Sequence, residues 1–348
     1  METAPLKRVN LTINGKAVEA DSDWTVLDAA RSAGFHIPTL CNHEDLLPYG
    51  ACRLCVVQIE GMRGMPPSCL IKVEDGMVVQ TDTEEVRAVR KVVAEMLLAD
   101  HPDDCLYCPK NLNCELQRIA EDLGIRERRL RRLTRDAPID ESNPFFVRDL
   151  NKCVLCGICV RTCEEITGIH AIDLVNRGYD TVVSPFMTDE IALSRCQSCG
   201  ECVVRCPTGA LTYKEEYKPE TEVRSICPYC GVGCGLSLGV RSGRVISVRG
   251  DTENIVNKGK LCVKGRFGTR EFLDHAERLK KPLIREGDDF REAEWDEALD
   301  LVAVKFNKYK GSFAALSSAK CTNEENYVFQ KFVRAVMGTN NVDHCARL

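Results

Sequence analysis

Cysteine spacing constrains this chain more than any other feature of its sequence. The 348 residues include 21 cysteines, most of them in groups separated by two or three residues. Secreted disulfide scaffolds are normally short and follow a signal peptide, whereas this chain is long and its first residues, METAPLKRVN, contain neither an apolar h-region nor a twin-arginine motif. Thiols at these spacings in a reducing compartment indicate metal ligands. We therefore expect a cytoplasmic protein with several metal sites.

Composition and charge narrow the class further. Apolar residues make up 44% of the chain and charged residues 28%, as in soluble globular proteins. The net charge of −5 gives no indication of nucleic-acid binding, and no apolar run approaches the length of a membrane span. The length predicts two or three ordinary domains, or more if they are small, and we expect no nucleic-acid partner and no direct membrane insertion.

The first cysteine group has the spacing C-x10-C-x2-C-x13-C and comprises Cys41, Cys52, Cys55 and Cys69. The residues before it predict a hairpin at RVNLTING and a helix at TVLDAARSAG, with Thr25 and Asp28 at capping-box spacing. Gly50 and Ala51 are small enough to let backbone N–H groups approach cluster sulfurs. This pattern resembles the 2Fe–2S ferredoxin domain at the N-terminus of complex I-type large subunits and many hydrogenases, which implies a β-grasp domain over residues 1–82. A zinc ribbon is the alternative, but zinc sites usually pair two short C-x2–4-C knuckles.

The second group is His101, Cys105, Cys108 and Cys114, in the stretch HPDDCLYCPKNLNC. It follows a predicted amphipathic helix, EEVRAVRKVVAEMLLAD, whose expected core face comprises Val86, Val89, Val93, Met96 and Leu97. The pattern resembles the 4Fe–4S domain with one His and three Cys ligands that follows the 2Fe–2S domain in the same families, and we assign it to residues 83–140. Zinc held by three Cys and one His remains open on this motif alone.

An arginine-rich stretch follows, GIRERRLRRLTRDAP, in which Leu130 and Leu133 interleave with the basic residues. We interpret it as a solvated helix face whose leucines pack inward, with no role in a site. DAPIDESNP after it is polar and contains two prolines, so we expect a linker there.

The third group is an internal repeat of C-x2-C-x2-C-x3-C within residues 141–220. This is the bacterial two-cluster ferredoxin pattern, in which the fourth Cys of each run binds the other cluster. The repeat therefore predicts one 4Fe–4S cluster on Cys153, Cys156, Cys159 and Cys206. It predicts a second on Cys196, Cys199, Cys202 and Cys163.

The fourth group has the different spacing C-x2-C-x3-C-x27-C and comprises Cys227, Cys230, Cys234 and Cys262. A strand-like stretch, RVISVRGD, and a polar loop separate its halves. With the glycines of CPYCGVGCGL, it resembles the 4Fe–4S domain that opens enzymes of the molybdopterin oxidoreductase superfamily, here residues 221–279. The resemblance implies that Lys264, two residues after the last Cys, relays electrons between cluster and pterin. Without the surrounding motif, Lys264 would be a solvated surface residue.

Five complete sets of four ligands use His101 and all the cysteines except Cys321 and Cys345. The sequence therefore predicts one 2Fe–2S cluster and four 4Fe–4S clusters, in an α+β multidomain iron–sulfur protein. This count of complete sets is the strongest prediction that the sequence supports.

Residues 280–348 change in character and predict a short hairpin followed by α/β structure. A helix is expected with Leu299, Val302, Ala303 and Phe306 on one face. A buried strand at Phe313 to Leu316, a loop at Ser317 to Asn323 and a helix at Asn323 to Met337 indicate the start of a βαβ unit. Ligands of such sheets lie beyond the strand C-termini, here that loop.

AKCTNEENY and GTNNVDHCARL resemble the metal-dependent formate dehydrogenase branch of the superfamily. The resemblance implies that residues 280–348 are an incomplete N-terminal part of the molybdopterin-binding domain, with Cys321 and Asn326 near the pterin. A polar helix N-terminus explains Asn326 equally well. Cys345 is expected beside the metal pocket.

The resemblance covers nearly the whole chain and implies the cytoplasmic formate dehydrogenase large (alpha) subunit. Such enzymes bind molybdenum or tungsten in two molybdopterin guanine dinucleotides, interconvert formate and CO2, and pass electrons to a flavin diaphorase for NAD(P), a ferredoxin or a hydrogenase. In that family the next residue after VDHCARL is the selenocysteine or cysteine metal ligand. We therefore expect that the chain is truncated just before this metal ligand. We expect that the truncated chain by itself does not oxidise formate.

Two other classes of protein share these domains. A non-catalytic subunit like the large subunit of complex I has similar N-terminal domains, but it lacks the complete two-cluster repeat. An iron-only hydrogenase shares the first three domains, yet CPYCGVGCGL does not match its catalytic cysteines. Both remain as alternatives, and the hydrogenase is the weaker.

Overall fold

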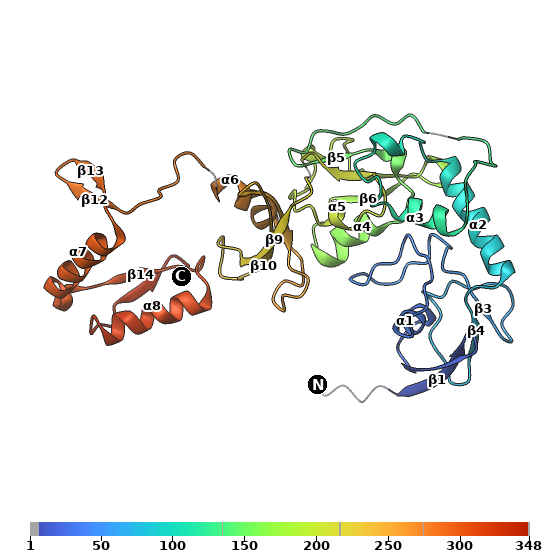
Figure 1. The fold of residues 1–348 in the computed structure, drawn as a ribbon, viewed down its shortest axis with the longest axis horizontal. Helices are drawn as coiled ribbons and strands as arrows, with labels where there is room; N and C mark the ends of the chain where they lie inside the picture. The colour runs from blue at the N-terminus through green and yellow to red at the C-terminus, as the bar shows by residue number, and fades with distance from the viewer. Residues whose placement is uncertain (1–6, 134, 216, 274, 347–348) are drawn as a thin grey trace. The chain divides into compact units, whose positions relative to one another are not determined.

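Alternating apolar residues near the N-terminus build the first sheet of the computed structural model, which describes residues 7–133, 135–215, 217–273 and 275–346 (Figure 1). The predicted hairpin forms, and its turn residues Asn14 and Gly15 both have the positive φ that a type I′ turn requires. The sheet is mixed, with strand order β2-β1-β4-β3, as in a β-grasp fold. Its strands are β1 (Arg8–Ile13), β2 (Lys16–Asp21), β3 (Gln58–Ile59) and β4 (Val78–Gln80).

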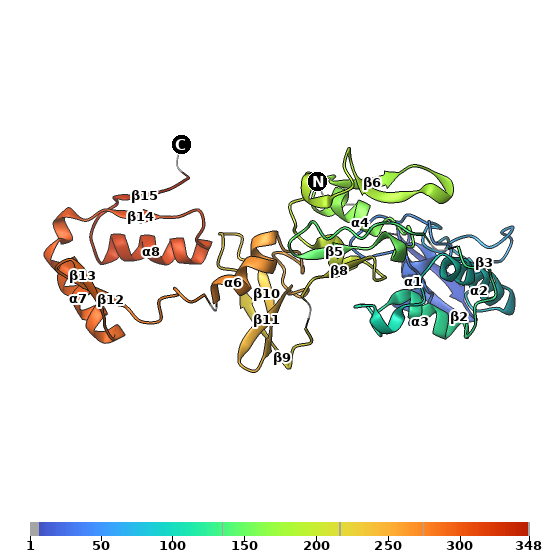
Figure 2. The same cartoon turned by 90° about the horizontal axis from the view of Figure 1, so that it is seen from above.

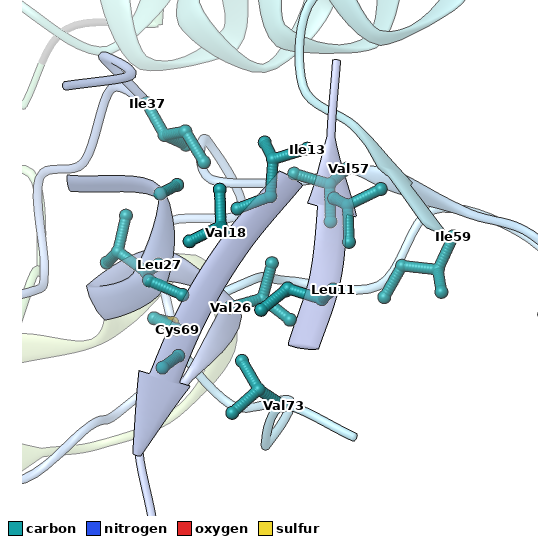
Figure 3. Packing of buried hydrophobic residues seen from close by; sticks show 14 of the residues in the cluster. Leu11, Ile13, Val18, Val26, Leu27, Ile37, Val57, Ile59, Cys69 and Val73 are labelled. Atoms are coloured by element: carbon teal, nitrogen blue, oxygen red, sulfur yellow. The ribbon is translucent and has the colours of Figure 1, made fainter. Parts of the chain in front are cut away.

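One short helix, α1 (Val26–Ser32), covers this sheet. The predicted capping box is present, because the Thr25 side chain accepts from the Asp28 N–H and the Asp28 carboxylate accepts from the Thr25 N–H. Figure 3 shows Leu11, Ile13 and Val26 meeting in the resulting core, which also contains Cys69. A metal ligand candidate thus belongs to the first hydrophobic core.

Helix α2 (Glu84–Ala99) forms where it was expected, but its buried face differs from the predicted one. Val86 is buried, whereas Val89 and Met96 are exposed. The buried stripe also includes Arg90, whose Nη2 donates to the Val56 carbonyl at 2.8 Å. The buried face of α2 therefore includes a hydrogen-bonded arginine, Arg90, and not Val89 and Met96, which apolar periodicity had placed there. Next along the chain come η1 (Cys105–Tyr107) and α3 (Glu115–Asp122).

The described residues of the arginine-rich stretch form no helix, so the predicted helix is wrong, and of its two leucines Leu133 is exposed whereas Leu130 is partly buried. Ion pairs hold its described residues to acidic residues of α2 and of the loop after it. Arg129 pairs with the buried Glu95 at 2.5 Å, Arg128 with Asp103, and Arg135 with Asp100 at 3.2 Å. Specific ion pairs, which hydrophobic periodicity does not report, set its conformation.

The expected linker at residues 136–144 is packed rather than free. Asp140 pairs with the buried Arg148 and accepts the N–H of Ile191 at 2.9 Å. Asn143 is buried and donates to the Ser198 hydroxyl at 2.8 Å. This polar segment therefore supports the ferredoxin repeat instead of separating two domains.

The ferredoxin repeat folds as two similar halves. Gly157 and Gly200 adopt left-handed φ values of 70° and 76°, and each precedes a short helix, α4 (Ile158–Arg161) or α5 (Glu201–Arg205). Two antiparallel strand pairs flank the helices: β5 (Phe146–Arg148) with β8 (Leu211–Tyr213), and β6 (Ile172–Val175) with β7 (Val182–Pro185). The remaining turns are η2 (Leu150–Lys152), the π-helical η3 (Thr162–Ile166), η4 (Gly178–Asp180) and η5 (Ile191–Leu193).

Residues Met1–Glu215 form one compact unit and Glu216–Leu348 another, and each is described by itself. The second unit begins with an antiparallel sheet of order β11-β10-β9, which includes the predicted strand RVISVRG. A π-helical turn and a short helix follow the sheet. The elements are β9 (Thr221–Ile226), β10 (Gly235–Arg241), β11 (Arg244–Gly250), η6 (Lys264–Gly268) and α6 (Thr269–Leu273).

The last part of the second unit has the expected hairpin, helix and βαβ start. Strands β14 and β15 pair in parallel, with α8 beside them (Figure 2). The predicted burial is wrong in two places, because Leu316 is 82% exposed and α7 has no buried residue. The elements are β12 (Leu283–Glu286), β13 (Asp289–Glu292), α7 (Trp295–Lys308), η7 (Lys310–Ser312), β14 (Ala315–Ser317), α8 (Asn323–Ala335) and β15 (Val342–His344). No helix among the described residues is both long enough and apolar enough to cross a membrane.

Candidate metal centres

The four cysteines of the first group lie together as two thiol pairs, Cys41 with Cys52 and Cys55 with Cys69. Backbone N–H groups point at the sulfurs, since Leu40 donates to Cys52 Sγ and Cys52 donates to Cys41 Sγ, each at 3.4 Å. The N–H of Ala51 also reaches Cys41, as the small residues of YGAC led us to expect. Donors of this kind stabilise the negative charge of cluster sulfurs.

The thiols of this group already differ in acidity. The hydrogen bond from Cys41 lowers the pKa of Cys52 to about 6, and that from Cys69 lowers the pKa of Cys55 to about 7. The pKa values of Cys41 and Cys69 are raised by the same hydrogen bonds and by burial. Because the thiolate is the form that binds metal, the chain offers two prepared ligands in this group.

The second group surrounds an open cavity of about 860 Å³ lined by His101, Cys105, Cys108 and Cys114. His101 is 8% exposed, and its Nδ1 lies 3.0 Å from the Pro102 carbonyl. Its Nε2 is buried and has no hydrogen-bond partner among the described residues. A buried nitrogen without a partner, on a ring whose other nitrogen a carbonyl orients, fits a ligand position.

Gly209 is a contributor to this cavity that the sequence did not reveal. It follows the last cysteine of the ferredoxin repeat, yet it lines the cavity of the second group. A Cβ at this position would lie 2.5 Å from Cys108 Sγ, so any larger residue would displace the sulfur. No spacing signal links residues this far apart in the chain.

The eight cysteines of the repeat line two separate apolar cavities. One is lined by Cys153, Cys156, Cys159 and Cys206, and the other by Cys163, Cys196, Cys199 and Cys202. The grouping is the exchange of fourth cysteines that the spacing predicts. Backbone donors are present here too, since the N–H of Ala171 donates to Cys163 Sγ at 3.2 Å.

Burial is the main cause of the raised pKa values of five of these thiols, those of Cys153, Cys156, Cys159, Cys196 and Cys202. It raises the pKa of Cys153 to about 11, and it raises the pKa values of Cys159 and Cys202 well above the ordinary range. Thiolates in such surroundings require a compensating positive charge, which iron supplies. Among the described residues, no group of three or more His, Cys, Asp or Glu side chains is placed to hold one single metal ion. The repeat cysteines line cavities instead, and this donor set fits a cluster.

In the second unit, Cys227, Cys230 and Cys234 lie in the connection from β9 to β10, and Cys262 precedes η6. Burial and the neighbouring thiols of the set raise the pKa values of Cys227 and Cys234. Cys230 and Cys262 are exposed. Asn257, which the sequence did not single out, holds the connection by bonding both the N–H and the carbonyl of Gly235, at 2.8 and 3.1 Å.

The remaining predicted site residues lie on exposed segments of the second unit. Lys264 is exposed at the start of η6, two residues after Cys262. Cys321 lies in the loop after β14, and Asn326 donates to the carbonyls of Ser318 and Cys321 at 3.2 and 3.4 Å. Asn326 therefore holds this loop in shape. Cys345 follows β15, and a hydrogen bond with the Ser318 hydroxyl at 3.5 Å lowers the pKa of its thiol.

Five family models match successive parts of the chain. They describe a 2Fe–2S iron–sulfur cluster binding domain (residues 6–84), the NADH-ubiquinone oxidoreductase-G iron–sulfur binding region (90–129) and a 4Fe–4S dicluster domain (152–210). The last two are the molybdopterin oxidoreductase Fe4S4 domain (220–273) and molybdopterin oxidoreductase itself (278–348). The chain belongs to the molybdopterin oxidoreductase superfamily and has complex I-like iron–sulfur domains.

Relatives of this superfamily match the chain along almost its whole length. The second G-type subunit of NADH-quinone oxidoreductase from Rhizobium meliloti is 40% identical over 97% of the chain, and the NADPH-Fe(3+) oxidoreductase alpha subunit of Geobacter sulfurreducens is 36% identical over 98%. A Staphylococcus haemolyticus protein named provisionally as a formate dehydrogenase is 29% identical over 97%. The chain spans about 40% of the length of each of these relatives.

The fold of this chain is also similar to that of a chain in a solved structure. A chain of an NAD⁺-reducing NiFe-hydrogenase in the H2-reduced state matches with a TM-score of 0.56 and 30% identity, over 59% of this chain and 87% of that chain. The chain is therefore an iron–sulfur electron-transfer module of a molybdopterin oxidoreductase family. The relative named for formate is less similar to it than those named for NADH or NADPH.

Proposed function

We propose that this module conducts electrons through one 2Fe–2S and four 4Fe–4S clusters, between a pterin-bound metal and a partner subunit that reacts with NAD(P). The main support is the grouping of nineteen cysteines and His101 into five sets, three of which line cavities of their own. The ligand sets are Cys41, Cys52, Cys55 and Cys69; His101, Cys105, Cys108 and Cys114; Cys153, Cys156, Cys159 and Cys206; Cys163, Cys196, Cys199 and Cys202; and Cys227, Cys230, Cys234 and Cys262.

The chain's own residues supply binding, charge control and exclusion of water at these sets. When bound, the clusters supply one-electron carriers. Backbone N–H groups of Leu40, Cys52 and Ala171 donate to sulfurs and so stabilise their negative charge. Burial around the repeat cysteines keeps water from the sulfurs, which favours electron transfer over loss of the metal.

Names of relatives support the partner assignment. Two relatives are named for NADH-quinone and NADPH-Fe(3+) oxidoreductases, and one similar solved structure is an NAD⁺-reducing hydrogenase. We therefore propose a flavin diaphorase for NAD(P), a ferredoxin or a hydrogenase as the electron-transfer partner. Lys264, two residues from Cys262, is the proposed relay toward the pterin.

Formate and CO2 are the substrate pair that we propose for the whole protein, with molybdenum or tungsten held by two molybdopterin guanine dinucleotides. The support is the likeness of AKCTNEENY and VDHCARL to formate dehydrogenases, and relatives that are provisionally named so. A non-catalytic protein of the complex I kind is the second candidate. The 40% identity to a G-type component of NADH-quinone oxidoreductase favours it.

The two candidates give different results in a dye-reduction assay on the purified whole protein, combined with molybdenum and tungsten analysis. Formate dehydrogenase reduces a viologen dye with formate and contains molybdenum or tungsten. A complex I-like protein contains iron alone and is inert to formate, while its clusters are still reduced through the NAD(P)-linked partner. A protein whose clusters accept no electrons from either source would overturn the whole proposal.

A further inference from the structure

One arginine of the ferredoxin repeat reaches into the first metal site. Arg161 ends helix α4, and its Nη2 donates to the carbonyl of Cys41 at 2.5 Å. Its Nη1 donates to the carbonyl of Leu47 at 2.6 Å, and the guanidinium lies 4.9 Å from the ring centre of Tyr49. One side chain thus fixes both ends of the loop that begins with a ligand of the first group.

The surroundings of Arg161 are closely packed. Cys41 and Cys156 belong to one buried apolar cluster with Leu46. The first group and the repeat therefore pack against each other through apolar contacts. A Cβ on Gly157 would lie 3.0 Å from the Tyr49 ring, so a larger residue there would require the ring to shift. Water is therefore largely excluded from the guanidinium, since Arg161 is only 7% exposed.

The charge of Arg161 has no carboxylate partner among the described residues, and its Nε is buried without a hydrogen bond. Arg205 in the other half of the repeat is the contrast, because it pairs with both Glu201 and Asp45. A buried charge without a counter-charge is costly. At Arg161 the metal sites that include Cys41 and Cys156 can supply the negative charge.

We infer that Arg161 is a positioning residue that holds the 2Fe–2S ligand loop and raises the reduction potential of that cluster. The inference rests on the proposed function, in which Cys41 is a ligand. Reduction adds one electron and no proton, so the cluster becomes more negative by one charge. A cation in a poorly screened site favours that state, which makes the potential less negative.

The test is a redox titration of the full chain, followed by the electron paramagnetic resonance signal of the reduced 2Fe–2S cluster. Arg161→Gln and Arg161→Met remove the charge, and Arg161→Lys keeps it while losing the forked hydrogen bonds. Arg31→Gln is the matched control, because Arg31 is an exposed cation that donates to Asn42, next to Cys41, at 2.7 Å. Far-ultraviolet circular dichroism shows which variants fold.

The charge-removing variants are expected to shift the midpoint potential to a more negative value, with Arg161→Lys and Arg31→Gln close to the wild type. Equal potentials in the wild type and in whichever charge-removing variant folds would overturn the inference. If neither folds, a clearly more negative potential for Arg161→Lys overturns it and an unchanged potential supports it. A wild-type chain without a 2Fe–2S signal would instead contradict the proposed ligands.

Discussion

The two units differ in how deeply they bury their candidate metal ligands. In Met1–Glu215, three of the four cysteines in the first group are buried, and the repeat cysteines surround apolar cavities within a packed core. In Glu216–Leu348, two of the four cysteines are exposed, every residue of β9 is exposed and α7 has no buried residue. The first group and the repeat thus have sites set in the core of the first unit, whereas two of the four ligand candidates of the second unit, Cys230 and Cys262, lie at its surface.

This difference has a physical consequence for assembly. Burial raises the pKa of thiols such as Cys159 and Cys202, so without metal they are protonated and poorly solvated. Metal binding and core formation are then coupled in the first unit. In the second unit, three of the cysteines lie in a connection between two strands of a three-stranded sheet, and we expect that sheet to remain folded when the metal is lost.

The largest expected effect is the loss of iron when one ligand is replaced in each unit. Cys202→Ser should lose about eight iron atoms, because both 4Fe–4S clusters of the repeat share one core and exchange their fourth ligands. Cys230→Ser, at an exposed sulfur, should lose only about four. Iron analysis of the two purified variants measures this. Equal losses in the two variants would remove the distinction between the units.

A buried ion pair in the first unit and an exposed one in the second give the next contrast. Asp140→Asn breaks the pair with Arg148, whose side chains are 9% and 5% exposed, and should cost about 3 kcal/mol of unfolding free energy. Glu294→Gln breaks an exposed pair with Lys281 and should leave the urea midpoint unchanged. Urea unfolding followed by circular dichroism measures both. Similar midpoint shifts would contradict the contrast.

The same pair makes a pH prediction. Burial alone would raise the pKa of Asp140, but hydrogen bonds from Ser142 and Ile191 and the charge of Arg148 lower it below the ordinary value. A depressed pKa in the folded state gives stability that is present above the unfolded value of about 3.9 and is lost as the pH falls below it. The difference in urea midpoint between wild type and Asp140→Asn should therefore narrow below about pH 4. If the difference between the two urea midpoints stayed constant from about pH 7 to about pH 3, the charge of the Asp140 carboxylate would not contribute to stability.

The smallest expected effect is a shift in the reduction potential of one cluster in the first unit, when one of its ligands is replaced by another. His101→Cys should keep its iron and give a more negative potential for that cluster, because a thiolate adds negative charge where a neutral imidazole stood. His101→Ala supplies no ligand and should lose about four iron atoms. Iron analysis and redox titration measure the two effects. Full iron and an unchanged potential in both variants would exclude His101 as a ligand.

Much of the fold follows from local sequence signals. The Asn14-Gly15 hairpin, the Thr25 and Asp28 capping box and the parallel strands around α8 are all present. Each depends on neighbouring residues or on a single short element. The cysteine spacings likewise grouped the eight ligands of the repeat as the two cavities do.

Burial and long-range partners could not be read in the same way. Val89 and Leu316 are apolar at positions where periodicity predicts burial, yet both are exposed, because burial depends on what covers a face. Gly209 and Arg161 act on cysteines that lie far away in the chain. Such contacts arise only when segments that are distant in the sequence fold together, and no local pattern encodes them.

The count of clusters tests the account most directly. Iron, acid-labile sulfide and zinc are measured on the anaerobically purified chain, with electron paramagnetic resonance of the reduced sample. Five complete sets predict about 18 iron and about 18 sulfide per chain, no stoichiometric zinc, and one 2Fe–2S signal beside those of 4Fe–4S clusters. Stoichiometric zinc with about four fewer iron atoms would show that one set, most directly that of His101, is a zinc site, and would contradict the five-cluster conductor.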